Sequence, residues 1–193
     1  AEKGVNEYMQ GIPLNERKRL GALLDDRPQT EVMAMIPQFS QAETDNFVAP
    51  PAQIPEALGV LMFNMERGVN LPEIQEFLRD CPDIQPFDVI LANELDDGCA
   101  RSGNKNTARE LAQAFGLNYA WGLEFIELVN DENAKGFHGN AVFSRWPIRR
   151  AGVIRLPEQY NWYFDRQKRI GGRLAVFAEL DVGGQPVGAV SIH

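Results

Sequence analysis

The sequence is poor in residues that hold soft metals or form covalent cross-links. Its 193 residues include two cysteines, Cys81 and Cys99, and two histidines. Two cysteines make no disulfide framework, and their spacing matches no zinc-binding pattern. We therefore interpret both cysteines as ordinary core or near-surface residues, and we expect neither a zinc site nor a disulfide scaffold.

Long apolar runs are also lacking. No stretch approaches the roughly 20 apolar residues that a membrane-spanning helix needs, and the first residues contain no apolar signal-peptide core. The composition is that of an ordinary globular domain. We therefore expect a soluble protein. Because the sequence begins without methionine, a leader is expected to have been removed if the protein is exported, and the compartment, cytoplasmic or exported, stays open.

The charge is unevenly spread along the chain. The net charge is −8, yet basic residues gather between residues 145 and 173. An acidic body with one basic segment favours a local anion site over an extended nucleic-acid-binding face. The alternative is that this segment is simply solvated charge.

Residues 87–98 are the most informative stretch. The apolar run 89–92 predicts a buried strand, and Asn93 and Glu94 follow it at once. A carboxylate at the end of a buried strand is a typical ligand of a hard cation such as Mg²⁺. The alternative is a strand that ends in a solvated acidic turn, which is our interpretation of Asp96 and Asp97.

A strand–helix–strand unit surrounds this stretch. Residues 59–68 predict a buried strand that ends in Asn64, and a helix with Pro72 in its first turn follows. This helix carries one apolar face. Such a crossover places its two strands parallel, so we expect Asn64 and Glu94 to lie near one another.

The other expected elements are less specific. Thr107 and Glu110 suggest a capping box that opens a helix ending at Gly116, and Asn15 is expected to cap an earlier helix. Residues 118–128 and 138–148 predict strands, residues 171–180 and 187–193 a hairpin, and residues 40–58 an extended loop. We divide the chain into an N-terminal extension, residues 1–58, packed on a main domain, residues 59–193.

The order of motifs in residues 59–193 resembles the endonuclease/exonuclease/phosphatase superfamily, which has the deoxyribonuclease-I-like fold. The resemblance rests on the strands ending in Asn64 and Glu94, on the run Gly139-Asn140-Ala-Val-Phe-Ser144, and on two further strands, residues 173–180 and 187–193. It does not reach the N-terminal segment. It implies an α/β (α+β) protein built as a four-layered α/β sandwich.

The resemblance also implies hydrolysis of phosphate monoesters or diesters with a divalent metal, usually Mg²⁺ but also Mn²⁺ or Ca²⁺. By position, Glu94 would be a catalytic metal ligand, and Asn64 would orient the metal's water or a phosphate oxygen. His193 would contact the scissile phosphate as a catalytic residue, and Asn140 and Arg173 would bind substrate. The chain departs from the family at Asn93, where many members carry Gln.

The resemblance further predicts that the domain is incomplete at its C-terminus. The family uses an Asp-x-Asn pair and a late Asp-His pair, and the second pair supplies its general base. Nothing follows His193. We expect a missing C-terminal segment or a second polypeptide to complete the fold.

We therefore predict a divalent-metal-dependent phosphoesterase that cleaves phosphodiester bonds, as a nuclease does. One alternative is a phosphatase or phospholipid phosphodiesterase of the same fold, and another is a non-catalytic binding module. The substrate would be a nucleic acid or a small phosphoester. We expect His138 to make ordinary hydrogen bonds in a loop; four aromatic residues either pack or stack on a base or sugar, namely Trp146, Tyr160, Trp162 and Tyr163.

Overall fold

The predicted strand–helix–strand unit is present in the fold. The computed structural model describes residues 8–158 and 161–193. Strand β2 (Val60–Arg67) is joined to β3 (Val89–Asp97) through helix α3 (Leu71–Asp80) and a short 3-10 turn, η3 (Pro82–Ile84). The two strands are parallel, and Asn64 pairs in register with Asn93. The predicted crossover is thus confirmed.

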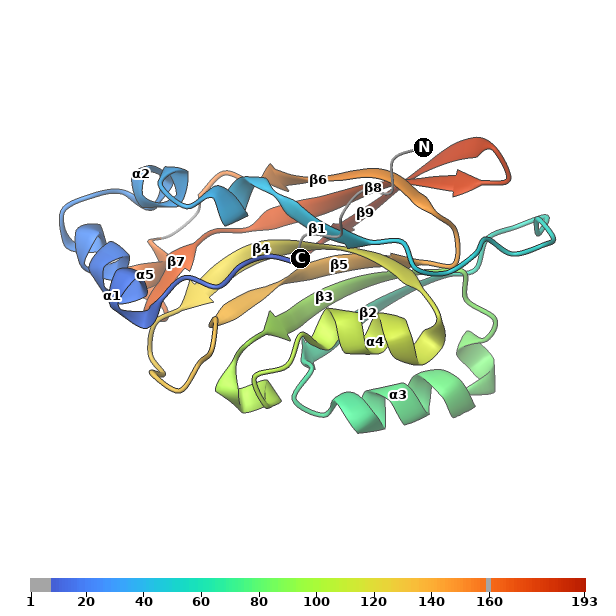
Figure 1. Ribbon diagram of the computed structural model, residues 1–193, viewed down its shortest axis with the longest axis horizontal. Helices are drawn as coiled ribbons and strands as arrows, with labels where there is room; N and C mark the ends of the chain where they lie inside the picture. The colour runs from blue at the N-terminus through green and yellow to red at the C-terminus, as the bar shows by residue number, and fades with distance from the viewer. Residues whose placement is uncertain (1–7, 159–160) are drawn as a thin grey trace.

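This parallel pair lies at one edge of the larger sheet (Figure 1), and β2, its outermost strand, exposes Val60 and Met62 instead of being buried as expected. The strand order of this sheet is β1-β4-β5-β3-β2, and a short strand, β7 (Arg169–Gly171), also pairs with β4. The remaining strands are β1 (Ala42–Asp45), β4 (Asn118–Glu127) and β5 (Phe137–Ser144). The strands expected over residues 118–128 and 138–148 are therefore present.

A second sheet packs on one face of the first. It contains β6 (Ile148–Arg155), β8 (Leu174–Val182) and β9 (Gln185–Ile192) in the order β6-β8-β9. The predicted hairpin is the β8–β9 pair, whereas β6 was not predicted. Val142, Trp146 and Val176 are fully or almost fully buried between the two sheets.

Helices cover the opposite face of the larger sheet. Helix α4 (Thr107–Phe115) lies beside α3 there (Figure 1), so the layers run helix, sheet, sheet. This is the expected α/β sandwich. In the described part of the chain the outer face of the second sheet is open over Ile154, Val190 and Ile192, so the fourth layer of the expected sandwich is not seen.

The N-terminal segment is part of the sheet. It contains α1 (Leu14–Ala22), η1 (Leu23–Asp25), α2 (Gln29–Ala34), η2 (Pro37–Ser40) and the edge strand β1, which pairs with β4. Residues 40–58 are therefore only partly the expected loop. The domain division at residue 58 stays a prediction, and residues 1–7 lie outside the described part.

Two predicted helix caps are wrong. Helix α1 begins at Leu14, directly after Pro13, so Asn15 already lies inside its first turn. Helix α4 is capped by Asn106, whose side chain accepts from the Arg109 N–H at 2.8 Å, one residue before the expected Thr107. The Thr107 hydroxyl instead donates to the Asp96 carbonyl at 2.7 Å.

Two short helical turns complete the described chain, η4 (Ala100–Ser102) and α5 (Trp162–Asp165). None of the helices in residues 8–158 and 161–193 combines the length and hydrophobicity needed to cross a bilayer.

Candidate functional site

Three strand pairs of the larger sheet each contain one register shift. β3 and β5 fall out of register at Asn93 and Glu94, β4 and β5 at Glu124, and β2 and β3 just beyond Asn64. An extra residue in one strand leaves the ladder and turns its side chain in a new direction. Two glutamates, Glu94 and Glu124, are re-aimed in this way on either side of β5.

Glu94 has a strained backbone. Its φ is +56°, in the left-handed region that costs a non-glycine residue about 1–3 kcal/mol unless its surroundings hold it. The Glu94 N–H donates to Oδ1 of Asn140 at 3.2 Å, and Asn140 is fully buried on β5. A buried amide therefore supports the turn that presents the Glu94 carboxylate.

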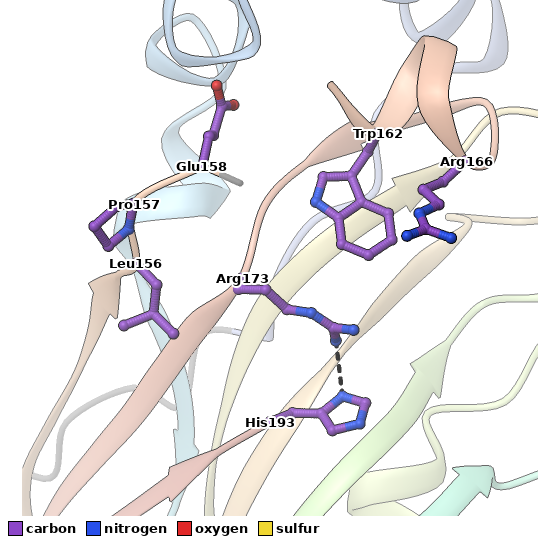
Figure 2. A pocket seen from close by; sticks show the side chains of 7 residues that line it. All are labelled: Leu156, Pro157, Glu158, Trp162, Arg166, Arg173 and His193. Atoms are coloured by element: carbon purple, nitrogen blue, oxygen red, sulfur yellow. Dashed lines mark hydrogen bonds between the residues drawn. The ribbon is translucent and has the colours of Figure 1, made fainter. Parts of the chain in front are cut away.

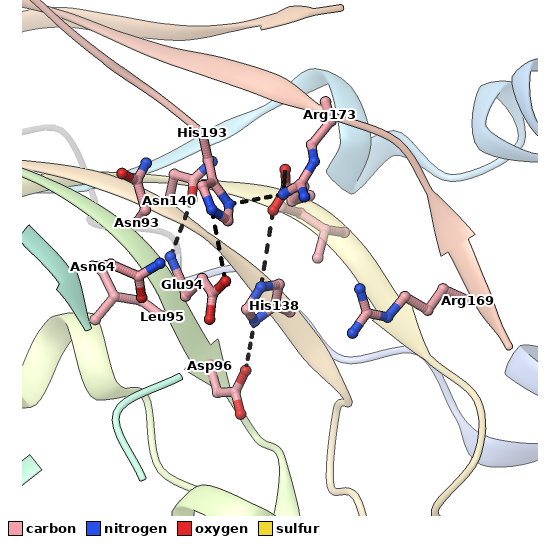
Figure 3. A network of polar contacts seen from close by, with 12 residues as sticks. Asn64, Asn93, Glu94, Leu95, Asp96, His138, Asn140, Arg169, Arg173 and His193 are labelled. Carbon is pink, nitrogen blue, oxygen red and sulfur yellow. Dashed lines mark hydrogen bonds and ion pairs between the residues drawn. The ribbon is translucent and has the colours of Figure 1, made fainter. Parts of the chain in front are cut away.

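A histidine at the end of the second sheet faces this carboxylate, and an arginine in turn contacts the histidine (Figure 3). Nε2 of His193 lies 3.7 Å from Oε1 of Glu94. Nη1 of Arg173 lies 2.8 Å from Nδ1 of His193 and 3.0 Å from Oε1 of Glu124. The structure thus brings together four of the five residues predicted for the site, namely Glu94, Asn140, Arg173 and His193.

The fifth predicted residue, Asn64, lies exposed near the end of β2. Its Oδ1 accepts from the Glu66 N–H at 2.9 Å. Its in-register partner Asn93 is almost buried, and its amide donates to the Ser191 hydroxyl on β9 at 3.3 Å. Asn93 therefore links the two sheets.

A second polar group lies behind the first. Nδ1 of His138 lies 2.8 Å from Oδ1 of Asp96, and Arg101 donates to the same carboxylate at 2.7 Å. Burial alone would raise the pKa of Asp96, but the hydrogen bonds from Arg101 and His138 hold it below its usual value. Nε2 of His138 faces Oε2 of Glu124 at 3.9 Å.

Three expectations about this group are wrong. Asp96 and Asp97 are buried residues of β3, not members of a solvated turn, because Arg101 and Lys135 neutralise them. His138 lies on β5, not in a loop. Glu124 was not predicted as a site residue. The signal that could have indicated it is a charged residue inside the largely apolar strand 118–128.

A pocket of about 650 Å³ opens beside His193 (Figure 2). Arg173, His193 and Arg166 bring basic groups to it, and its other lining residues are Leu156, Pro157, Glu158 and Trp162. The Trp162 ring packs on Phe125 with centroids 4.8 Å apart, and the Arg173 guanidinium lies over it at 5.1 Å.

The four aromatic residues considered for packing or for stacking lie in different surroundings. Trp146 is buried in the core between the sheets, so it stacks no ligand. Trp162 is largely covered by its neighbours, and the Lys168 ammonium lies over the Tyr163 ring at 3.7 Å. Tyr160 lies outside the described residues. These contacts are those of packing aromatics.

Most arginines of the basic segment are committed to neighbours. Arg155 donates to backbone carbonyls, and four others pair with carboxylates: Arg149 with Asp181, Arg150 with Glu179, Arg169 with Glu127 and Arg173 with Glu124. These arginines therefore link neighbouring strands, and among the described basic residues of the segment Arg166 and Arg173 line the pocket.

The oxygen ligands near the pocket fit a hard cation. Glu94 keeps 21% of its side chain exposed, and the neighbouring strand supplies the amide oxygen of Asn64. Mg²⁺ is commonly held by one or two carboxylates, with water and phosphate in the other positions. Nδ2 of buried Asn140 has no hydrogen-bond partner. Within the described residues, no group of three or more His, Cys, Asp or Glu side chains is arranged to hold a metal ion, so the protein itself offers one carboxylate and one amide oxygen.

No family model matches the sequence, and no curated protein matches it. Among solved structures, the chain is similar to an endonuclease/exonuclease/phosphatase family protein from Leptotrichia buccalis C-1013-b, with 20% identity, 71% of this chain and 55% of that chain covered, and a TM-score of 0.49.

Two other solved structures are similar. One is the 3′ phosphatase NExo from Neisseria bound to product DNA hairpin, with 19% identity, 71% and 41% of the two chains covered, and a TM-score of 0.41. The other is SmcL, with 13% identity, 72% and 48% covered, and a TM-score of 0.44. The chain spans about half the length of the solved structures it matches.

Proposed function

We propose that the protein is a divalent-metal-dependent phosphoesterase that hydrolyses phosphodiester bonds by in-line attack of water. The observation that supports this proposal is the chain of contacts from Glu94 through His193 to Arg173, the last two of which line one pocket. They come from separate strands of both sheets, and β-bulges and buried partners hold them there. A carboxylate, an imidazole and a guanidinium together suit phosphoryl transfer.

Glu94 and Asn64 are the residues that would hold the metal. The cation, Mg²⁺ or in its place Mn²⁺ or Ca²⁺, supplies Lewis-acid stabilisation of charge on the phosphoryl oxygens when it is bound. The role of the protein is to fix the position of the Glu94 carboxylate. The strained backbone of Glu94 and its hydrogen bond to Asn140 do so.

His193 would stabilise the leaving oxygen by a hydrogen bond. Arginine only donates hydrogen bonds, so the Arg173 contact at 2.8 Å requires Nδ1 of His193 to be the acceptor. The neutral ring then carries its proton on Nε2, the nitrogen that faces Glu94. As water attacks phosphorus and loses a proton to solvent, the bond to the leaving oxygen breaks, the Nε2–H donates a hydrogen bond to that oxygen, and a proton from solvent completes the alcohol.

Arg173 and Asn140 would bind the phosphate. One guanidinium edge of Arg173 is fixed by Glu124 and His193, and a third of its side chain stays exposed to the pocket. Its other N–H groups are available to a phosphate oxygen, which matches guanidinium geometry. The buried amide nitrogen of Asn140 is a further donor of the kind that an anion satisfies.

The charge of the protein favours a small phosphodiester over a long nucleic acid. The net charge is −8, and most arginines of the basic segment are neutralised by neighbours. A nuclease needs many phosphate contacts, and its affinity falls steeply as salt rises. A phosphatase or phospholipid phosphodiesterase activity of the same site is the second candidate, and this charge distribution is what favours it.

The test compares three substrate classes at about 50 and about 200 mM salt. Bis(4-nitrophenyl) phosphate, 4-nitrophenyl phosphate and single-stranded DNA would be offered with Mg²⁺. We expect the diester to be hydrolysed fastest, at a rate that changes little with salt. Faster cleavage of DNA with a steep salt dependence would favour the nuclease, and no turnover of any substrate would favour a binding module.

A further inference from the structure

An apolar groove adjoins the pocket at His193. Its volume is about 380 Å³. The N-terminal segment and the strand end after β6 form its walls, which include Met33, Ala34, Ile36, Phe39, Leu156 and Pro157. Leu156, Pro157, Glu158 and Arg173 line both hollows. The groove is therefore continuous with the candidate site, and Arg173 lies where the two meet.

Two polar side chains in the walls of this groove, Arg155 and Ser40, are hydrogen-bonded to the protein itself. Arg155 donates to the Phe39 carbonyl at 2.7 Å and to the Gly172 carbonyl at 3.2 Å, and its guanidinium lies 4.8 Å from the centre of the Phe39 ring. The Ser40 hydroxyl donates to the Pro37 carbonyl at 2.9 Å. A ligand in the groove thus meets mostly hydrocarbon, which selects an apolar group over one that needs hydrogen bonds.

The groove is also fixed in place. The side-chain amide of Gln29, at the start of α2, donates to the Arg169 carbonyl at 2.9 Å and accepts from the Gly171 N–H at 3.0 Å. Gln29 is almost completely buried. Together with Arg155, this amide ties α2 and η2 to the two sheets. Because the groove is preformed, ordering its walls costs little binding free energy.

We propose that the apolar groove binds an alkyl chain carried by the substrate's alcohol, while Arg173 and His193 hold the phosphate. This inference rests on the proposed function and extends it to a substrate class, the phosphoesters of alcohols that carry long alkyl chains. It also gives the N-terminal segment a role in specificity. A nucleoside fits less well, because its base would find few hydrogen-bond partners along these walls.

The test measures binding without hydrolysis. Methyl-, butyl- and octylphosphonic acid present the same head group with increasing chains, and their carbon–phosphorus bond is not an ester. Isothermal titration calorimetry of the purified protein gives each Kd. We expect Kd to fall roughly threefold to fourfold with each added methylene until the groove is full.

Two variants make the test specific. Ala34 is exposed and lines the groove, so Ala34→Trp is expected to fill it and to remove the chain-length dependence. Met35, the next residue, is also exposed but does not line the groove. Met35→Trp is therefore the matched control and should keep the dependence of Kd on chain length. The methylphosphonate Kd should be the same in all three proteins.

The possible results distinguish alkyl-chain binding in the groove from the proposed hydrolysis. A Kd independent of chain length in the native protein, an unchanged dependence in Ala34→Trp, or tighter binding of adenosine monophosphate than of octylphosphonate would each overturn the groove, even if diesters are hydrolysed. A chain-length dependence that Ala34→Trp abolishes supports the groove even if hydrolysis fails, and in that case the proposed reaction falls while the alkyl-binding site stands.

Discussion

Nη1 of Arg173 donates to Nδ1 of His193 across 2.8 Å, so this ring nitrogen is an acceptor. The other histidine shows the reverse arrangement. Nδ1 of His138 lies 2.8 Å from a carboxylate oxygen of Asp96, which only accepts when ionised, so this nitrogen carries a proton. The protein thus holds two histidines with opposite Nδ1 protonation.

This contrast can be observed by NMR. The sequence contains two histidines, so a protein labelled with ¹⁵N-histidine gives two imidazole spin systems, which His193→Asn assigns. At neutral pH we expect an unprotonated Nδ1 in His193 and a protonated Nδ1 in His138. Arg173→Lys should mix the tautomers of His193 and leave His138 unchanged. A protonated Nδ1 in the native His193 would remove the proposed donor role of Nε2.

The backbone of Glu94 predicts a conflict between stability and activity. Its φ of +56° is strained for glutamate and free for glycine. Glu94→Gly should therefore be more stable than Glu94→Ala by about 1 kcal/mol, which raises Tm by about 2–4 °C in a chain of this size. Both variants should lose hydrolysis. Equal melting temperatures for the two variants would mean that the strain is not stored at this residue.

Gly139 predicts a large loss of stability on substitution. A Cβ at this position would lie 2.0 Å from the carbonyl oxygen of Gly122, on the paired strand. The backbone has to shift, so Gly139→Ala should destabilise the protein by about 3 kcal/mol in urea unfolding. Gly152→Ala is the control, because its Cβ would meet nothing within 4 Å. Equal unfolding midpoints for the two variants would contradict the close approach of β4 and β5.

Asp97 predicts a pH dependence of stability. Burial raises its pKa to about 6, although Lys135 partly opposes this and the acids Glu43 and Asp96 add to it. Since the pKa is higher in the folded state than in the unfolded one, the protonated residue stabilises the fold below about pH 4. That contribution is lost as the pH rises through about 6.

Comparison with Asp97→Asn isolates this effect from other titrating groups. The free energy of unfolding of the native protein, minus that of Asp97→Asn, should fall by up to about 3 kcal/mol between about pH 4 and about pH 7. Urea unfolding of both proteins across this range is the measurement. A difference that stays constant with pH would show that Asp97 titrates as an exposed carboxylate does.

The sequence predicts the parts of the fold that local patterns encode. The apolar runs before Asn64 and Glu94, with a helix between them, specify the parallel crossover and bring both residues to neighbouring positions. The strands do not end there as expected, because β2 continues to Arg67 and β3 to Asp97. The β8–β9 hairpin follows from its turn and alternation. In both cases the deciding signal lies within a few tens of residues.

Other parts of the site depend on distant pairing. Glu124 becomes a site neighbour because β4 and β5 slip by one residue next to it, and no period-2 pattern shows such a slip. Asp96 was interpreted as solvated because its partners His138 and Arg101 cannot be assigned to it from the sequence. Buried charges are stable only with their partners, so they become predictable only once the strand order is known.

The most direct test of the proposed function is the rate at which the native protein and Glu94→Gln hydrolyse bis(4-nitrophenyl) phosphate, with Mg²⁺ and with EDTA. The substitution preserves the shape of the side chain and removes its charge. We predict a rate that requires Mg²⁺ in the native protein and falls at least about 100-fold in Glu94→Gln, as expected when an electrostatic contributor to the transition state is lost. An equal, EDTA-insensitive rate in both proteins would contradict the assignment of Glu94 and of the metal.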